Sequence, residues 1–550
     1  MPTQKLTDRV LVTGVTLNDL VHIVIPTDIS QNPAGSSYKA TIGQVMNTIT
    51  GSTIMILGDG VGSTERCANN NNACCDYSTV SGGRCNTALN TYSTIGGGCS
   101  NFACGSKSTV GGGTKNTAYG DFSTLSGGYC NTSEGVLSTL SGGYCNTSFG
   151  YTSTIAGGAQ NTTSSYYSII GGDFIGGGQQ NTISSYSSYY YSGLNFIGGG
   201  QQNTINVFSN SFTPSAYNFI GGGFLNVITG ESTNTIVGGG SNFIGSDVSS
   251  FIGGGGGNTI SPQVNYSTIV GGTNNTSNGC VSFIGGGDSN TSNGNLSVVV
   301  GGSTNISSKL HSVVVGGYGN ISDGIYSFVG GGVGNESFGE FSFIGGGTTN
   351  TLSSYGSTIG GGRLNKILTS GSSISTIAGG SGNTITSTGS TIGSTIAGGI
   401  FNTIIGDCSI VGGGYKNTSN CCYSVVVGGE CNTSNSRYSI ILGGQSNTSS
   451  GSASTVVGGI SNFTNGNYSF IGGGGYNTSN GVHTGILGGS GNTISNNCSF
   501  IVGNGITTDR DNTTFMNCLS IVDLQDGAGG LPSGSVYYCS TDSNRIYYVP

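Results

Sequence analysis

A serine recurs every 15 residues through much of this 550-residue chain, and so short a period leaves few folds open to it. Each serine opens a segment such as SVVVGGSTNISSKLH or SFVGGGVGNESFGEF. A fixed period of this length is typical of a solenoid, in which each repeat contacts only its neighbours. In the most regular stretch the serines are Ser267, Ser282, Ser297, Ser312, Ser327, Ser342 and Ser357.

The residues within one repeat predict its local structure. With the serine as position 1, position 3 is Ile or Val in this stretch, positions 5 and 6 are Gly-Gly, and position 9 is Asn. Fifteen residues are too few for two packed helices, and Gly, Ser, Thr, Val and Ile are poor residues for helix interiors. We expect each repeat to be one rung, with a short strand, a Gly-Gly bend, a second short strand and a turn. The chain is therefore predicted to be all-β, a parallel β-solenoid of about 28 rungs and on the order of 130 Å long.

The first strand of many repeats is apolar on both faces. Side chains alternate along a strand, so position 3 points to one face, while position 2, for example Phe283, Val298 or Phe343, points to the other. A strand that is apolar on both faces is buried on both. We expect position 3 to fill the solenoid interior, and neighbouring copies of the chain around a symmetry axis to cover the other face. The predicted interior residues include Ile284, Val299, Val314, Val329 and Ile344.

Asparagine at position 9 is the most persistent polar feature of the repeats. A column of identical amides can hydrogen-bond to itself and to turn backbone, and Asn tolerates left-handed turns. We interpret the column as a structural ladder. Two alternatives stay open, a ligand-binding ladder and N-glycosylation, because many of these residues begin Asn-x-Ser/Thr motifs. The ladder includes Asn131, Asn146, Asn275, Asn290, Asn305, Asn320, Asn335, Asn417 and Asn432.

The segments outside the regular period divide the chain. Residues 1–60 do not repeat and are predicted to form an N-terminal attachment or cap domain, followed by a polar junction at 61–77. The array is predicted to span 78–505 and to be irregular and loop-bearing at 168–258. Residues 506–550 contain a predicted hairpin, SVYYCS and RIYYVP, and we expect a C-terminal β cap that also holds neighbouring chains in register, because a terminal rung exposes strand edges.

The insertions of the irregular region are rich in Tyr and Ser. This composition is like that of antibody paratopes, where rigid rings lie beside small polar groups, so one interpretation is contact with a receptor or glycan on a host surface. The interpretation that we favour is that a solenoid simply tolerates such loops. The candidate contact residues are Tyr186, Tyr189, Tyr190, Tyr191 and Tyr217.

Composition argues against several classes of partner. The net charge is −8 and the 14 Lys and Arg residues are scattered singly, so we expect no nucleic-acid partner. No stretch approaches 18 uninterrupted apolar residues, so no membrane insertion is expected. The N-terminus lacks the basic start, apolar run and cleavage site of a secretory signal.

Most of the sixteen cysteines fall at repeat positions, where we interpret them as small apolar side chains that fill space. Cys130 and Cys145 share position 8 of adjacent rungs, which stack about 4.8 Å apart, so a disulfide between them is the alternative. With three His residues and no Cys-x-x-Cys pair, neither a metal site nor a cofactor is expected.

Catalysis is not expected either. Glycan-cleaving enzymes need two carboxylates about 5 to 10 Å apart. In this chain the acidic residues are sparse, and none recurs at a clustered position of the repeat. The Gly-Gly-Gly runs are bends at strand ends rather than phosphate-binding loops, because no GK[ST] sequence follows them. We therefore predict a protein without enzymatic activity and without catalytic residues.

The repeat [ST]-[TVF]-[IV]-x-G-G with its small polar turn, found from Tyr77 to Gly505, resembles the head repeats of trimeric autotransporter adhesins, which also occur in viral and phage fibre proteins. The segments LNDLVHIVIPTDISQNPAGSSYKATIGQV and IVGNGITTDRDNTTFMNCLSI are similar to parts of phage and large-virus fibres. The resemblance implies a left-handed β-roll assembled as a homotrimer.

For function, the resemblance implies a structural fibre of a phage or large virus. The N-terminal domain would dock onto the virus particle or a similar assembly, and the projecting rod would attach to a host surface. An autotransporter also needs an export signal, a coiled-coil stalk and a β-barrel anchor, which the sequence does not suggest, so the virion surface is the expected location. The alternative is a cellular surface adhesin or extracellular filament subunit, either secreted or held at the cell surface.

Overall fold

In the computed structural model the chain forms two compact units, an N-terminal unit, Met1–Asn290, and a C-terminal unit, Thr291–Pro550. The structure describes most of the repeats and short parts of both ends. The described residues are 20–25, 36–41, 55–66, 70–166, 172–187, 194–209, 217–230, 232–246, 248–369, 374–386, 393–517, 530, 532–533, 536–539 and 545–548.

Each rung contributes one strand to each of two parallel sheets. The first sheet takes positions 2 and 3 of the repeat, and the second sheet takes positions 10 and 11. In one regular rung these strands are β10 (Thr109–Val110) and β11 (Thr117–Ala118). Each strand pairs with the strand one rung further on, so that Thr109 pairs with Thr124. The predicted all-β parallel solenoid of about 28 turns is confirmed, and the described residues contain no helix.

Both sheets are present in each unit. In the N-terminal unit the first sheet runs from β4 (Thr64–Arg66) to β30 (Phe283–Ile284), and the second from β5 (Asn72–Ala73) to β29 (Thr276–Ser277). In the C-terminal unit the second sheet runs from β31 (Thr291–Ser292) to β57 (Thr493–Ile494), and the first from β32 (Val298–Val299) to β59 (Thr514–Met516).

The array begins one repeat earlier than predicted, inside the segment 61–77 that the sequence analysis treats as a junction. Thr64 of β4 pairs in parallel with Thr79, and Asn71 accepts the backbone N–H of Asn86 at 3.1 Å, as a position 9 residue does. This rung is hard to recognise because Glu65 replaces Ile or Val at position 3. Its carboxylate accepts the backbone N–H of Ala73 at 2.8 Å.

The array also extends beyond the predicted boundary at residue 505. Strand β59 pairs in parallel with β58 (Phe500–Val502), so that Phe500 lies opposite Thr514. This step is 14 residues long, and Ile506 stands where position 9 normally carries Asn. The regular period therefore fails although one more turn follows.

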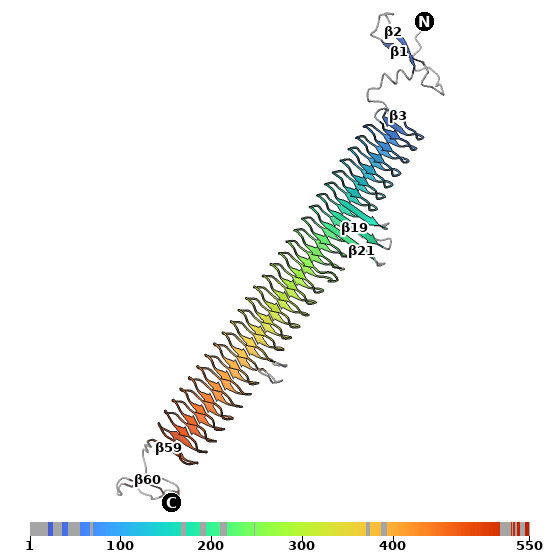
Figure 1. Ribbon diagram of the computed structural model, residues 1–550. Coiled ribbons are helices and arrows are strands. Elements are labelled where there is room, and N and C mark those ends of the chain that lie inside the picture. The colour runs from blue at the N-terminus through green and yellow to red at the C-terminus, as the bar shows by residue number, and fades with distance from the viewer. Residues whose placement is uncertain are drawn as a thin grey trace. The chain divides into compact units, whose positions relative to one another are not determined.

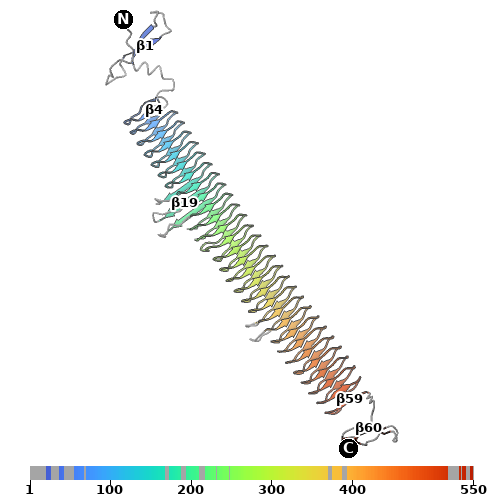
Figure 2. The same ribbon diagram turned by 180° about the vertical axis from the view of Figure 1, so that it is seen from behind.

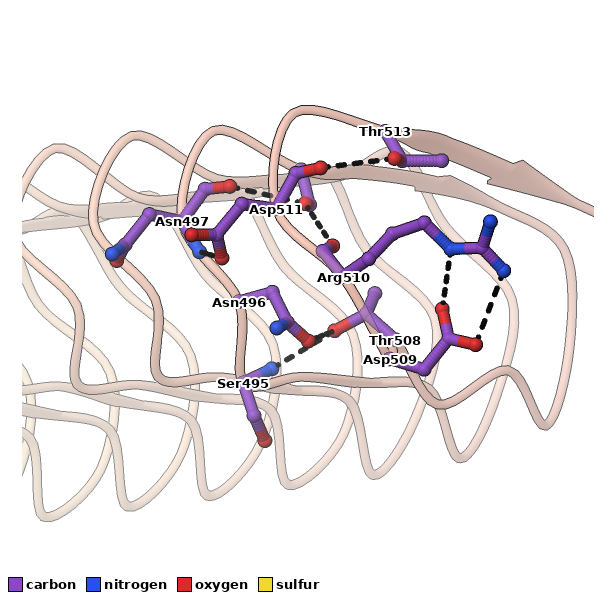
Figure 3. Close-up of polar contacts among 9 residues, drawn as sticks. Ser495, Asn496, Asn497, Thr508, Asp509, Arg510, Asp511 and Thr513 are labelled. Atoms are coloured by element: carbon purple, nitrogen blue, oxygen red, sulfur yellow. Dashed lines mark hydrogen bonds and ion pairs between the residues drawn. The ribbon is translucent and has the colours of Figure 1, made fainter.

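Side chains of this last turn bind the rung before it (Figure 3). Asp511 accepts the backbone N–H of Asn497 at 2.8 Å, and Thr508 donates its hydroxyl to the side chain of Asn496, also at 2.8 Å. Arg510 donates two hydrogen bonds to Asp509, at 2.8 and 3.2 Å, which lowers the pKa of that exposed carboxyl group. The end of the array is thus held by polar contacts in place of the Asn column.

The terminal segments contain antiparallel hairpins. Strand β1 (Leu20–Ile25) pairs with β2 (Ser36–Thr41), and β3 (Met55–Leu57) pairs with β4. The hairpin predicted near the C-terminus is confirmed as β60 (Val536–Cys539) with β61 (Arg545–Tyr548). The rest of the predicted attachment and cap domains lies largely outside the described residues.

All insertions enter the solenoid at one corner of the rung. From Asn161 the steps between successive position 9 residues are 20, 22 and 23 residues, yet in these rungs position 1 precedes position 9 by eight residues. The extra residues therefore fall between the second sheet of one rung and the first sheet of the next. In this region β17 (Thr162–Tyr166), β19 (Thr182–Ser187) and β21 (Thr204–Ser209) are longer than their neighbours, and β19 and β21 project from the stack (Figures 1 and 2).

One rung of this region starts later than the period predicts. The period places a serine at Ser168, but β16 (Thr154–Ile155) pairs with β18 (Phe174–Ile175), so Asp173 occupies position 1. The reason is that β17 continues outward to Tyr166, which leaves too few residues for the chain to return by Ser168.

Candidate functional site

The position 9 asparagines form a hydrogen-bonded column in which each amide joins two rungs. The side-chain oxygen of Asn335 accepts the backbone N–H of Asn350 at 3.0 Å. The side-chain nitrogen of Asn335 donates to the carbonyl oxygens of Gly331 in its own rung, at 2.8 Å, and of Gly347 in the next rung, at 2.9 Å. The fully buried members of this column include Asn131, Asn146, Asn275, Asn290, Asn305, Asn320, Asn335, Asn417 and Asn432. Burial leaves no access for an external ligand or a glycan in the folded chain, which favours the structural interpretation.

The position 3 residues fill the interior beside this column. All five of the predicted interior residues have no exposed surface, namely Ile284, Val299, Val314, Val329 and Ile344. Position 11, on the opposite sheet, also points inward and is often Ser or Ala rather than a large apolar residue. The interior is therefore partly a network of hydroxyl and amide groups.

Buried serines form a second polar column that the sequence analysis did not identify. Ser322 at position 11 shares a hydrogen bond of 2.6 Å with Ser327 at position 1 of the following rung, and Ser327 donates to the carbonyl of Gly324 at 2.7 Å. Where position 11 is Ile, as at Ile404, the next position 1 hydroxyl bonds differently, and Ser409 donates to the carbonyl of Cys421 at 2.9 Å. The joint occurrence of Ser at positions 1 and 11 is the sequence signal for this pairing.

The outer face of the first sheet in the C-terminal unit exposes apolar side chains in rows. At position 4, Val300 is 47% exposed, Val315 39%, Val427 50% and Leu442 46%. Position 2 on the same face is also apolar in these rungs, and Phe343 is 41% exposed. Extended apolar surface of this kind marks an interaction site in soluble proteins.

The glycines beside this face differ in how much space they have. At position 6 the fold requires glycine, because Gly317 has a φ of +87° and a Cβ atom there would lie 2.0 Å from the carbonyl oxygen of Gly332. At position 5 a Cβ atom on Gly301 or Gly316 would have no atom within 4 Å, and their φ angles lie outside the left-handed region. The same open space surrounds Gly361, Gly428, Gly443, Gly458 and Gly488. In other rungs the backbone itself favours glycine at position 5, since Gly286, Gly331, Gly346, Gly413 and Gly473 have φ angles between 148° and 159°, whereas neither crowding nor a left-handed φ accounts for the glycines named above.

The structure describes two of the candidate contact residues, Tyr186 on the projecting strand β19 and Tyr217 just before the short strand β22 (Phe219–Ile220). Tyr186 of β19 is 41% exposed and Tyr217 is 55% exposed. Tyr189, Tyr190 and Tyr191 lie outside the described residues. Phe208 of β21, which the sequence analysis did not single out, is 63% exposed, and its ring centroid lies 6.5 Å from that of Tyr186.

A buried carboxyl group anchors the projecting strands to the solenoid. Asp173 is 1% exposed, and its Oδ2 accepts hydrogen bonds from Ser165 of β17 at 2.5 Å and from Ser185 of β19 at 3.3 Å. Its Oδ1 accepts the amide of Asn195 at 3.0 Å. Burial raises the pKa of Asp173, although these hydrogen bonds oppose the shift. Asn218 and Asn234 continue the column at position 1 of the next rungs.

Cys130 and Cys145 are free thiols at adjacent position 8 corners. Both corners have a left-handed backbone, with φ angles of 60° and 50°. Burial and the neighbouring Cys130 thiol raise the pKa of Cys145. Among the described residues, no group of three or more His, Cys, Asp or Glu side chains is arranged to bind a metal ion.

No helix in the described part of the chain has the length and hydrophobicity needed to cross a membrane. No protein-family model and no curated protein sequence matches this chain.

Proposed function

We propose that the chain is a non-enzymatic subunit of a homotrimeric fibre on the surface of a phage or large-virus particle, where it serves in attachment to a host. In this proposal the N-terminal segment docks onto the particle, the solenoid is a rigid spacer, and the terminal segments cap it. The left-handed β-roll, the number three and the viral setting derive from the resemblance to autotransporter adhesin heads and fibre proteins.

The observation that carries the proposal is the position 5 glycine column beside the apolar rows. Gly301 and Gly316 have open space around them in a single chain, yet glycine recurs there from rung to rung. Glycine is the residue that allows a second backbone to approach closely. Val300 and Val315, in the same two rungs, supply apolar surface for that contact.

A second copy of this chain fits such a face better than an unrelated partner does. The apolar rows repeat at the spacing of parallel strands, about 4.8 Å. Only a partner with the same spacing stays in register with these rows over many rungs. Another copy of the chain necessarily has the same spacing. Copies arranged around a symmetry axis use the same face, so a closed assembly leaves none of these rows exposed.

Electron microscopy of the purified full-length chain tests the fibre proposal. We expect uniform rods with a threefold cross-section and one distinct end. The control is one variant in which Val300, Val315, Val427 and Leu442 are all changed to Lys. Because these four side chains are exposed in a single chain, the variant should still fold, but it should no longer associate. Single-chain particles for the unmodified protein would contradict the proposal.

A further inference from the structure

The projecting strands β17, β19 and β21 form a small surface unlike the rest of the solenoid. Most strands are two residues long, but these have five, six and six residues. They pair in parallel along this length, with Ser164 opposite Ser184, and Ser184 opposite Asn206. The next outward row places Tyr186 opposite Phe208.

Alternation along these strands separates an outer from an inner face. Ser185 and Val207 are buried on the inner side, whereas Ser184, Asn206 and the two aromatic residues are at least partly exposed. The outer face thus has one row of small polar groups next to an aromatic row. A hollow of about 250 Å³ lies at this surface, lined by Ser164, Ser184, Tyr186 and Phe208, with the buried Ser185 beneath them.

The two rings of this hollow are arranged differently from the other aromatic pairs of neighbouring rungs in this region. Phe174 and Phe196, for example, stack with centroids 4.9 Å apart and an interplanar angle of 7°, so each ring covers its neighbour. The rings of Tyr186 and Phe208 are 6.5 Å apart and tilted by 41°. Since Phe208 is also 63% exposed, much of the surface of this ring is open to a ligand.

The base of the surface is fixed from within. Ser185, one residue before Tyr186, donates to the buried carboxyl of Asp173 and accepts the amide of Asn195 at 2.9 Å. Ser165 of the neighbouring strand binds the same carboxyl oxygen. A site held by such a network loses little conformational freedom when it binds a ligand.

We propose that this hollow binds one pyranose ring of an uncharged oligosaccharide. Aromatic rings offer apolar faces that pack against the C–H groups of a sugar, and hydroxyl and amide groups both donate and accept hydrogen bonds. The described residues of the lining include no charged side chain, which disfavours sulfated, phosphorylated or sialylated sugars. Its volume is below the roughly 300–1,000 Å³ of pockets for larger ligands, as suits a single ring. The inference rests on the proposed function, because it names the chemistry by which such a fibre meets a surface.

Calorimetric titration of the full-length chain with maltotriose, cellotriose, N-acetylchitotriose and sialyllactose tests the inference. We expect at least one of the three uncharged sugars to bind with a dissociation constant of about 0.1–10 mM, as shallow sites do. Phe208→Ala should raise the dissociation constant at least about fivefold, because an aromatic contact with the sugar is lost. The matched control is Phe102→Ala, which removes an exposed ring from the same sheet at position 10 of a regular rung.

The inference is overturned if none of the three uncharged sugars binds, if sialyllactose alone binds, or if Phe208→Ala binds as the unmodified chain does. Melting temperatures of both variants should match that of the unmodified chain, since both rings are exposed. Mass in solution separates this result from the fibre proposal. Trimers that bind no sugar refute only the site, whereas single chains that bind sugar refute only the fibre.

Discussion

The side-chain oxygen of Asn320 accepts the backbone N–H of Asn335, one rung further on, at 2.9 Å. This bond repeats from rung to rung inside the solenoid, and it satisfies an N–H group that no water reaches. Rungs with very different insertions are thereby kept in register, since the bond persists across steps of 22 and 23 residues from Asn181 to Asn226. The Asn column thus makes each rung depend on the next.

Replacing one member of the column should destabilise the protein markedly. Asn335→Ala leaves the backbone N–H of Asn350 without its acceptor and removes the donor to Gly331 and Gly347. Because each unsatisfied buried group costs about 1–3 kcal/mol, we expect a loss of roughly 2–4 kcal/mol, measured by urea denaturation followed by circular dichroism. Asn480→Ala, at an exposed position, is the control and should unfold at the same urea concentration as the unmodified chain. Equal stability of the two variants would contradict the structural role.

Asp173 should make the stability of the protein fall as the pH rises. Burial raises the pKa of this carboxyl above its ordinary value of 3.8, so folding favours the neutral form. The stabilisation by the protonated carboxyl group is fully present below its ordinary pKa and is lost as the pH rises through its raised pKa in the folded protein. Asp173→Asn places an amide at position 1, as Asn195 and Asn218 do in the next rungs. This variant should lose the pH dependence of stability that Asp173 causes. Thermal melting of both proteins between pH 4 and 8 measures it, and parallel curves would show that Asp173 does not titrate in this way.

Two cysteines should differ in reactivity. Hydrogen bonds from Ser100 and Arg84 lower the pKa of Cys99, whereas burial and Cys130 raise the pKa of Cys145. Since the thiolate is the nucleophile, iodoacetamide at pH 8 should alkylate Cys99 faster than Cys145 in the folded protein. Peptide mass spectrometry over time gives both rates. Changing Arg84 to Gln should slow only Cys99, and a faster reaction at Cys145 would contradict the assignment.

The two glycine columns should respond differently to substitution. Gly301→Leu with Gly316→Leu places side chains in open space, so the single chain should keep its circular dichroism spectrum and melting temperature while the proposed trimer dissociates. Gly317→Ala instead puts a Cβ atom 2.0 Å from a backbone oxygen and should destabilise the rung itself. If the double leucine variant stays fully trimeric, the position 5 column does not face another chain.

The period of the sequence was enough to predict the rung, the two strands, the inward position 3 and the bend at positions 5 and 6. The period did not reveal a rung where one residue departs from the repeat motif although the strands of that rung still pair with their neighbours. Glu65 at position 3 conceals the first rung, and Ile506 at position 9 conceals the last. The choice of Asp173 over Ser168 depends on how far β17 extends beside β19, which no local motif encodes.

The candidate surfaces were predictable only in part. The Tyr-rich composition pointed to the projecting strands, but the tilt between Tyr186 and Phe208 depends on strand register rather than on composition. The contrast between positions 5 and 6 was equally hidden, because both are glycine in the sequence and only the backbone shows that one is crowded and the other open. That the outer face of the first sheet is covered by other copies stays a prediction.

The mass of the full-length chain in solution tests the central claim most directly. Sedimentation equilibrium should give three times the 55.0 kDa of one chain, and the quadruple lysine variant at Val300, Val315, Val427 and Leu442 should give the mass of one. A single-chain mass for the unmodified protein over a wide concentration range would contradict the account, since the apolar rows would then face water.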